Sequence, residues 1–402
     1  MLGRVVASYR EAFRGLPGPV WLLCVAALVH RAGTLVLPFL SLYLTEELGL
    51  TLRQAGLLLG LYGVAAIPAS LLGGWLSDRI GALRVLALSL VGSGVVLLLL
   101  VWARSLLEIG AGIVLLSLIA EPFRPAVMSA LSERAPIELR PRAFALLRLA
   151  VNLGMTVGPA FGGFIATRNY GWLFVIDAVT CWLALLVVRG ALSEPQPSDA
   201  SASDATTGRG PWRDGPFLLL MLIILGLAAV VFQFLGSLPV FFRRDYGLTE
   251  DLIGLLLGLN ALIIVLVEMP LVRELERFDR LRIVGLGCVL TCVGFGILPL
   301  GESIGFAALS IAIWTAGEML TLPFANALVA ERAPRAHRGR YMGVYTMTYA
   351  LAFVVAPLGG MALYQRFGGG ALWGSILAMA LPLGLGCLAL VPVFGVRRAG
   401  SD

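Results

Sequence analysis

Six ionisable side chains lie in the middle of long apolar stretches, where a charge needs a partner or a function. At the centre of a membrane-spanning helix such a charge costs about 2.5–3.5 kcal/mol. A carboxylate in these surroundings is suited to exchanging protons, and an arginine is suited to binding a carboxylate or a phosphate. The six residues are Arg31, Glu121, Arg124, Arg148, Asp177 and Glu318.

The sequence "IAEPFRPA" carries two of these charges three residues apart. Glu121 and Arg124 share a face if the segment is helical. Pro122 and Pro125 distort a helix and free backbone carbonyls, which is tolerated only beside protein or water. We expect Glu121 to exchange a proton while substrate competes for Arg124. A permanent ion pair that only stabilises the segment is the alternative.

The other carboxylates are further candidates for proton coupling. Glu318, in "WTAGEMLTLPF", faces the cavity from the second half of the chain in this interpretation. Asp177 is expected near the outer end of its helix, partly exposed to water. Arg31 is expected to meet substrate or a cavity carboxylate, with pairing to Glu121 as the alternative. His30, about 100° away from Arg31 on a helix, is expected to pack and form a hydrogen bond.

Polar and aromatic residues in the same stretches are candidates to line a substrate cavity. Together with Arg31 and Arg124, the expected substrate-binding residues are Arg148, Gln233, Asn260, Tyr62 and Trp314. The chain has only two histidines and no phosphate-binding Walker loop, so we expect neither an enzyme nor a metal or cofactor site. Its five cysteines fall inside apolar stretches and are expected to be buried and unpaired.

These residues require long membrane-spanning helices to position them. The chain has 402 residues, and its apolar stretches repeatedly exceed the roughly 20 residues that span a bilayer. Mean hydropathy is +0.91, which also favours a membrane protein. No cleavable signal peptide is expected at the N-terminus. The predicted spans are 18–44, 51–74, 84–104, 107–130, 142–166, 172–190, 215–241, 249–272, 283–300, 303–329, 341–365 and 370–395.

The two halves of the sequence are related by an offset of 198 residues. "GLTLRQAGLLLGL" from Gly49 matches "GLTEDLIGLLLGL" from Gly247, and "SERAP" at Ser132 matches "AERAP" at Ala330. We therefore expect two pseudo-symmetric six-helix bundles, 1–192 and 215–402, around a site near the middle of the membrane. The polar segment 193–214, rich in Ser, Asp and Pro, is expected to be a flexible linker.

The net charge of +6 comes from arginine alone, because the sequence has no lysine. Most of these arginines fall in the even-numbered connections between spans. The positive-inside rule then places both termini in the cytoplasm, and we expect a multi-pass protein of the inner membrane. This distribution argues against nucleic-acid binding.

The charged stretch "GGWLSDRIGALR", from Gly73 to Arg84, is predicted to form the turn between the second and third spans. It resembles the best-known signature of the major facilitator superfamily, although Ala82 replaces a basic residue. In that family the turn latches the bundles on the cytoplasmic side. Gly74 is expected to permit close helix approach, Gly81 to form the turn, and Asp78 to pair with Arg134 or Arg142. The expected gate residues are Gly74, Asp78, Arg79, Gly81, Arg84 and Arg142.

The fifth span carries "NLGMTVGPAFGG", which resembles the glycine–proline motif of drug–proton antiporters in that superfamily. Gly154, Gly158, Pro159 and Gly162 permit tight packing and a bend. Ordinary small-residue packing is the alternative.

The resemblance implies a secondary active transporter that works by alternating access. Its partners would be a small-molecule substrate, protons and the lipid bilayer, and it is expected to be a monomer. We favour proton-coupled export of small amphipathic compounds. Uptake or facilitated transport of an anionic, zwitterionic or lipid-like solute is an alternative. A non-transporting receptor or scaffold on the same fold is an alternative of another class.

Overall fold

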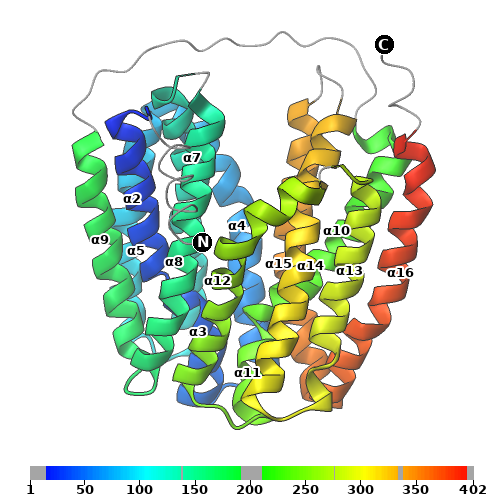
Figure 1. The fold of residues 1–402 in the computed structure, drawn as a ribbon. Helices are drawn as coiled ribbons and strands as arrows, with labels where there is room; N and C mark the ends of the chain where they lie inside the picture. The colour runs from blue at the N-terminus through cyan, green and yellow to red at the C-terminus, as the bar shows by residue number, and fades with distance from the viewer. Residues whose placement is uncertain (1–14, 137–138, 192–210, 276, 334–337, 396–402) are drawn as a thin grey trace. The chain divides into compact units, whose positions relative to one another are not determined.

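The computed structural model describes residues 15–136, 139–191, 211–275, 277–333 and 338–395, and the described chain is almost entirely helical (Figure 1). Twelve helical segments in it are long and apolar enough to cross a membrane, as the sequence predicts. The fifth and sixth, Arg142–Ala166 and Gly171–Gly190, match the predicted ranges to within one residue at either end. Apolar length alone therefore locates the spans well.

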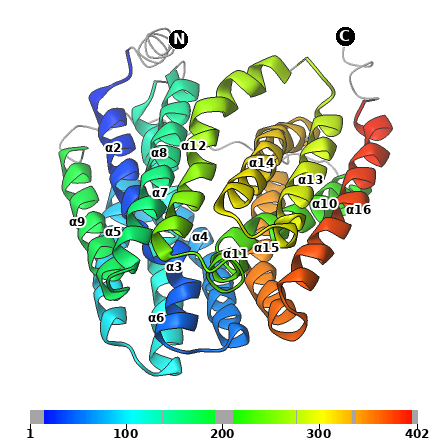
Figure 2. The same ribbon diagram turned by 60° about the horizontal axis from the view of Figure 1, so that its bottom comes forward.

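Packing contacts divide the chain into two compact units. The first unit comprises residues 1–37 and 65–201. In it α2 packs against α8 and α9, and α5 packs against α6, α7 and α9 (Figures 1 and 2). Its helices are α2 (Gly18–Gly33), the later part of α4 (Leu52–Ile80), α5 (Ala82–Trp102), α6 (Leu106–Ala120), α7 (Phe123–Arg134), α8 (Arg140–Ala166) and α9 (Gly171–Ala191).

The second unit comprises residues 38–64 and 202–402. Here α13 packs against α14 and α16, which run beside it in Figures 1 and 2. Its elements include α3 (Val36–Leu42), the π-helical turn η1 (Tyr43–Glu47) and the earlier part of α4. The others are η3 (Pro211–Arg213), α10 (Gly215–Val231), η4 (Phe232–Phe234), α11 (Ser237–Arg244), α12 (Glu250–Leu275), α13 (Arg280–Gly296), η5 (Leu298–Leu300), α14 (Ile304–Arg332), α15 (Arg338–Phe367) and α16 (Gly369–Gly395).

These units are defined by packing contacts, whereas the predicted bundles 1–192 and 215–402 are defined by the sequence repeat. The predicted bundles are therefore not tested by the units and stay a prediction. Residues 38–64 belong to the first copy of the repeat but pack with the second unit. Of the predicted linker, residues 193–210 lie outside the described chain, and Asp214 caps the start of α10 by accepting the Phe217 amide at 3.3 Å.

The 198-residue offset recurs in the helix boundaries. Helices α4, α5, α6, α8 and α9 begin at Leu52, Ala82, Leu106, Arg140 and Gly171, and their counterparts begin at Glu250, Arg280, Ile304, Arg338 and Gly369. Gly49 and Gly247 both adopt a positive φ, 66° and 64°. The backbone therefore repeats as the sequence does.

Three spans are interrupted. The first breaks after Gly33 and the seventh after Val231, at equivalent positions of the repeat. The fourth breaks at Glu121 and Pro122, between α6 and α7, whereas the equivalent α14 is continuous around Pro323. Pro122 lacks the amide that would continue the helix. The hydroxyl of Ser89 on α5 donates to the carbonyl of Ile119 at 2.7 Å, so a carbonyl freed by the break is satisfied.

Candidate functional site

The second unit holds a polar cluster centred on Glu318 of α14. The side-chain amide of Asn260, on α12, donates to Glu318 Oε2 at 3.0 Å and to Thr315 Oγ1 at 3.0 Å. Asn260 is buried and Glu318 is half-buried. Asn260 was expected to line a cavity, which stays a prediction, and the structure shows its amide helping to orient the Glu318 carboxylate.

Two tyrosines of α15 extend this cluster. The hydroxyl of Tyr345 donates to that of Tyr349 at 3.3 Å, and Tyr349 lies within electrostatic range of Glu318. Sequence reasoning missed both residues. The signal was their spacing of four residues, which places two hydroxyls on one helix face.

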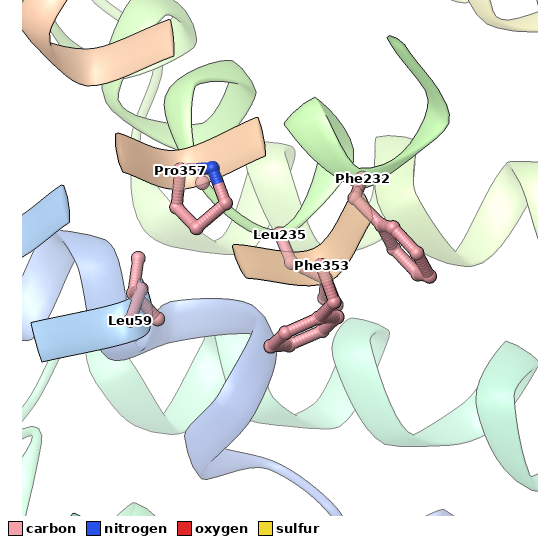
Figure 3. A pocket seen from close by; sticks show the side chains of 6 residues that line it. Leu59, Phe232, Leu235, Phe353 and Pro357 are labelled. Carbon is pink, nitrogen blue, oxygen red and sulfur yellow. The ribbon is translucent and has the colours of Figure 1, made fainter. Parts of the chain in front are cut away.

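A small apolar pocket lies at the break in the seventh span (Figure 3). Its cavity volume is about 10 Å³, which is close to the space of a single water molecule, so in this conformation it is too small for a small-molecule ligand. Tyr62, an expected cavity residue, has its ring 5.7 Å from that of Phe353, one of the lining residues. The residues that line the pocket are Leu59, Phe232, Leu235, Gly236, Phe353 and Pro357.

Two expected substrate residues are packing residues in the structure. Gln233 is 5% exposed, and its amide nitrogen donates to the carbonyl of Ala356 on α15 at 2.9 Å. Trp314 is 1% exposed and stacks on Phe295, with centroids 4.8 Å apart. The prediction that they line a cavity is wrong in this conformation, because both side chains point into helix–helix contacts.

In the first unit, Asp177 is buried and not partly exposed as expected. It is 5% exposed, and its Oδ2 accepts the amide of Val36 at 3.4 Å, just past the break in the first span. Arg31 lies within electrostatic range of this carboxylate. The expectation that Asp177 is partly exposed to water is wrong, because its helix α9 packs against α2.

His30 packs as expected. Its ring lies 4.4 Å from that of Phe123, and its Nδ1 lies 3.7 Å from Cys181 Sγ. Cys181 also approaches Asp177 Oδ1, at 3.9 Å. The five cysteines are buried and free.

The structure does not join Glu121 and Arg124 as an ion pair. Glu121 is half-buried at the break, whereas Arg124 is exposed on α7. The backbone of Glu121 and Pro122 keeps helical dihedral angles, and the Arg124 amide donates to the Glu121 carbonyl at 3.3 Å, so the three-residue relation is kept although the side chains do not pair. No ion pair links the two side chains within the described residues. Arg148, on α8, is also exposed.

The turn between α4 and α5 has the expected geometry only in part. Gly81 adopts a φ of 90°, as a tight turn requires. A Cβ on Gly74 would meet nothing within 4 Å, whereas one on Gly73 would lie 2.6 Å from Pro122 Cα. The observed close approach therefore belongs to Gly73, and the approach expected at Gly74 stays a prediction.

The charges of this turn are mostly exposed. Arg79 lies over the ring of Trp75, 4.3 Å from its centroid, and Arg84 and Arg142 are exposed. The Asp78 side chain lies outside the description, so its pairing with Arg134 or Arg142 stays a prediction. Glu276, which is equivalent to Asp78 in the second copy of the repeat, also lies outside the described residues.

Two glycines of the fifth span lie at close helix contacts, which fits both the motif and ordinary small-residue packing, so the motif stays a prediction. A Cβ on Gly154 would lie 2.6 Å from Arg31 Cβ, and one on Gly158 would lie 3.1 Å from the carbonyl oxygen of Ala32. Pro159 lies inside α8, and Gly162 is buried. Close packing of α2 on α8 fixes the position of Arg31 relative to α8 in the first unit.

Within the second unit, two segments of the first copy of the repeat are tied to the second copy. Arg244, at the end of α11, bonds Glu46 of η1, with Nε to Oε1 at 3.0 Å. These two residues are 198 positions apart and so are equivalent in the repeat. The Arg53 amide donates to Gln365 Oε1 at 2.7 Å, and a Cβ on Gly56 would lie 2.7 Å from the Pro357 carbonyl oxygen.

No group of three or more His, Cys, Asp or Glu side chains gathers as a metal site among the described residues.

Comparison with known proteins shows what the chain resembles. A cation antiporter of Planococcus maritimus, named for Na⁺, Li⁺, K⁺ and H⁺, is 24% identical and covers 81% of this chain and 84% of its own. The multidrug resistance protein MdtH of Aeromonas hydrophila is 25% identical, covering 86% and 87%. A crystal structure of a peptide transporter in complex with sulfate has a TM-score of 0.82 at 18% identity, covering 95% and 96%, which shows the fold alone.

The family model for the Major Facilitator Superfamily matches residues 22–357 and 234–401, which together include nearly every described helix. The described chain has twelve spans in two repeated sets, and the relatives named above match it along most of their length. Both findings agree with the family match. The chain belongs to the Major Facilitator Superfamily and is a multi-pass membrane transporter.

Proposed function

We propose that this transporter couples proton entry to the export of small amphipathic compounds by alternating access. The observation that carries the proposal is the carboxylate of Glu318 inside the tenth span, held by Asn260. A carboxylate kept in place within a span serves proton exchange, which explains why its cost is tolerated.

The surroundings of Glu318 favour a molecule with a polar and an apolar end. The hydroxyls of Tyr345 and Tyr349 offer hydrogen bonds near the carboxylate. The apolar rings of Phe232 and Phe353 lie in the same unit, with centroids 5.0 Å apart, and the ring of Phe232 lies 6.5 Å from that of Tyr349. Relatives named as multidrug resistance proteins are consistent with such a substrate.

The first unit supplies further ionisable groups for coupling. Glu121 lies at an interrupted helix, where Ser89 rather than the helix satisfies the backbone. Arg31 lies within electrostatic range of Asp177, on the helix against which Gly154 of α8 packs. We assign proton exchange to Glu318 first and to Glu121 second, and we assign Arg31 to anionic groups of the substrate.

Placement in the inner membrane, with both termini in the cytoplasm, is part of the proposal. The arginines gathered in the even-numbered connections support it.

Exchange of an alkali cation for protons is a second candidate function. Glu318, Asn260 and Thr315 bring carboxylate, amide and hydroxyl groups together, and hard cations prefer oxygen ligands. A cation antiporter among the relatives is consistent with this chemistry.

The test is transport in proteoliposomes with an imposed pH gradient. The probes are cationic dyes, short peptides, organic anions, and Na⁺ or Li⁺ salts, and an internal pH dye reports proton movement. We expect dye-driven proton movement, lost in Glu318→Gln and kept in Glu302→Gln, a matched change at an exposed position. A response to Na⁺ or Li⁺ alone would favour the second candidate. Loss in Glu121→Gln with full activity in Glu318→Gln would move the proton site to the first unit.

A further inference from the structure

Both places where a membrane span passes from one unit to the other coincide with a defect in helical hydrogen bonding. The first crossing lies between Leu37 and Pro38, just after the break at Thr34 and Leu35. The second lies between Val64 and Ala65 within α4. There Pro68 has no amide to donate to the carbonyl of Val64, its i−4 partner in an α-helix. Such defects are where helices bend.

An ionisable group accepts a hydrogen bond at the first of these defects. Asp177 accepts the amide of Val36, one of the donors that the break leaves without a helical partner. At the equivalent break in the seventh span, Ser375 occupies the position of Asp177, and its hydroxyl donates to the Leu372 carbonyl of its own helix. At this break in the seventh span, the neutral side-chain amide of Gln233 donates to the carbonyl of Ala356 on α15. The two copies of the repeat therefore differ at this point by one titratable carboxyl.

We propose that Asp177 is a proton-dependent positioning residue that holds the hinge of the first span. As a carboxylate it accepts the Val36 amide and keeps residues 34–38 in the observed conformation. When a proton binds Oδ2, that oxygen becomes a donor and releases the amide, so residues 38–64 can move with the second unit. This inference rests on the proton coupling of the proposed function and gives that coupling a mechanical consequence.

The groups that face Asp177 come from several helices. From α2, Arg31 lies within electrostatic range of the carboxylate, and His30 contacts it through Cys181 of α9. From α5 the one ionisable residue is Arg84, near the opposite end of that helix. From α8 the ionisable residues are Arg140, Arg142 and Arg148, all before its midpoint, whereas Asp177 packs near its end.

The hinge can be followed without any substrate. Because the five native cysteines are buried and free, spin labels can be placed selectively at exposed positions. We would label Thr167→Cys, in the first unit after α8, and Glu47→Cys, in the second unit at the end of η1. The distribution of distances between the labels, measured by double electron–electron resonance at pH 5 and pH 8, reports the hinge.

We expect the distribution to change with pH in the otherwise native chain and to be the same at both pH values in Asp177→Asn. His30→Gln is the matched control, and it should keep the pH response. A pH response retained in Asp177→Asn, or abolished only by His30→Gln, would overturn the inference. Because no cargo is present, a failed transport assay with an intact hinge response would count against the proposed function and not against this inference.

Hydrogen exchange in the unsubstituted chain provides a second measurement, in case Asp177→Asn folds poorly. After correction for intrinsic rates, protection of the Val36 amide should fall at pH 5 by about tenfold or more, as loss of a hydrogen bond to a charged group predicts. Protection at the break of the seventh span, around Gln233, should not change. Equal behaviour of the two breaks would contradict the inference.

Discussion

At the scale of single residues, polar groups in and beside the spans divide into those that bond a helix backbone and those that bond a charge. Gln233 and Ser89 donate to backbone carbonyls beside interrupted helices, those of Ala229 and Ile119. Asn260 instead holds the carboxylate of Glu318, and Asp214 holds the guanidinium of Arg332. Only the second kind is expected to change with pH or ligand.

Replacing Asn260 with Ala should remove the donor that orients Glu318. Hydrogen bonds to charged groups contribute about 1.5–3 kcal/mol, so we expect a roughly tenfold or greater loss of proton-coupled transport. Transport under an imposed pH gradient measures it. Thr321→Val is the control, because the Thr321 hydroxyl bonds only the backbone carbonyl of residue 318. Full activity of Asn260→Ala would show that the carboxylate needs no positioning.

Asp214 provides a pH-dependent prediction outside the spans. Burial raises the pKa of this carboxyl, but hydrogen bonds from Arg332, the Phe217 amide and Tyr341, with the charge of Arg332, hold it below its usual value. The pair therefore contributes its full stability above the ordinary carboxyl pKa of about 4, and the contribution is lost as pH falls through the lower folded-state value.

Asp214→Asn should retain the cap on α10, because Asn and Asp are equivalent at that position. We expect it to lose roughly 1–2 kcal/mol at pH 7 through the missing arginine pair. At pH 2–3 the difference from the native chain should shrink. Thermal unfolding in detergent at the two pH values measures both effects, and a difference that does not depend on pH would contradict the assignment.

At the scale of elements, proline and glycine decide where helices break and how closely they approach. Pro122 interrupts the fourth span, whereas α14 continues through Pro323. Gly154 brings α8 against α2, with its Cβ position 2.6 Å from Arg31 Cβ. These contacts set the position of Arg31 and of the break that follows it.

Gly154→Ala and Gly74→Ala should therefore differ, although both place a methyl group in a helix. The first must push α2 away, and overpacking of this kind costs about 1–3 kcal/mol. The second meets open space and should be neutral or gain about 0.5–1 kcal/mol from helix propensity. Thermal unfolding in detergent compares them.

The transport activity of Gly74→Ala is a separate measurement. A stable variant that no longer transports would place the close approach at Gly74 in another conformation of the cycle. A destabilised Gly74→Ala would contradict the open surroundings described for it.

The sequence predicts the elements better than the contacts of their side chains. Span positions follow from the length of apolar runs, and the repeat follows from identities at a constant offset. Trp314 and Gln233 were misplaced because a polar or aromatic residue in an apolar helix faces a cavity or a neighbouring helix with the same sequence signature. Glu121 and Arg124 keep the backbone relation that their spacing predicts, but the spacing does not fix the directions of two long side chains. The burial of Asp177 depends on α2, more than 130 residues earlier in the chain.

At the scale of the whole molecule, the packing units do not coincide with the copies of the repeat. Residues 38–64, from the first copy, pack with the second unit. The Glu46–Arg244 ion pair and the bond from the Arg53 amide to Gln365 are part of that packing. Transport by alternating access would require these contacts to form and break.

Reversing one charge of the Glu46–Arg244 pair should impair transport, and reversing both should restore it. Exposed ion pairs contribute about 0.2–1 kcal/mol, so we expect Glu46→Arg or Arg244→Glu alone to reduce the rate a few-fold. The double variant should recover most of the loss, as measured in proteoliposomes at low salt. A double variant no better than either single variant would show that the pair plays no part in the cycle.

The equivalence of Glu46 and Arg244 also bears on the symmetry of the repeat. In two identical copies, equivalent positions carry the same residue, so a direct contact between them joins like with like. Here the contact joins a glutamate to an arginine, so at this point the two copies are complementary in charge rather than identical.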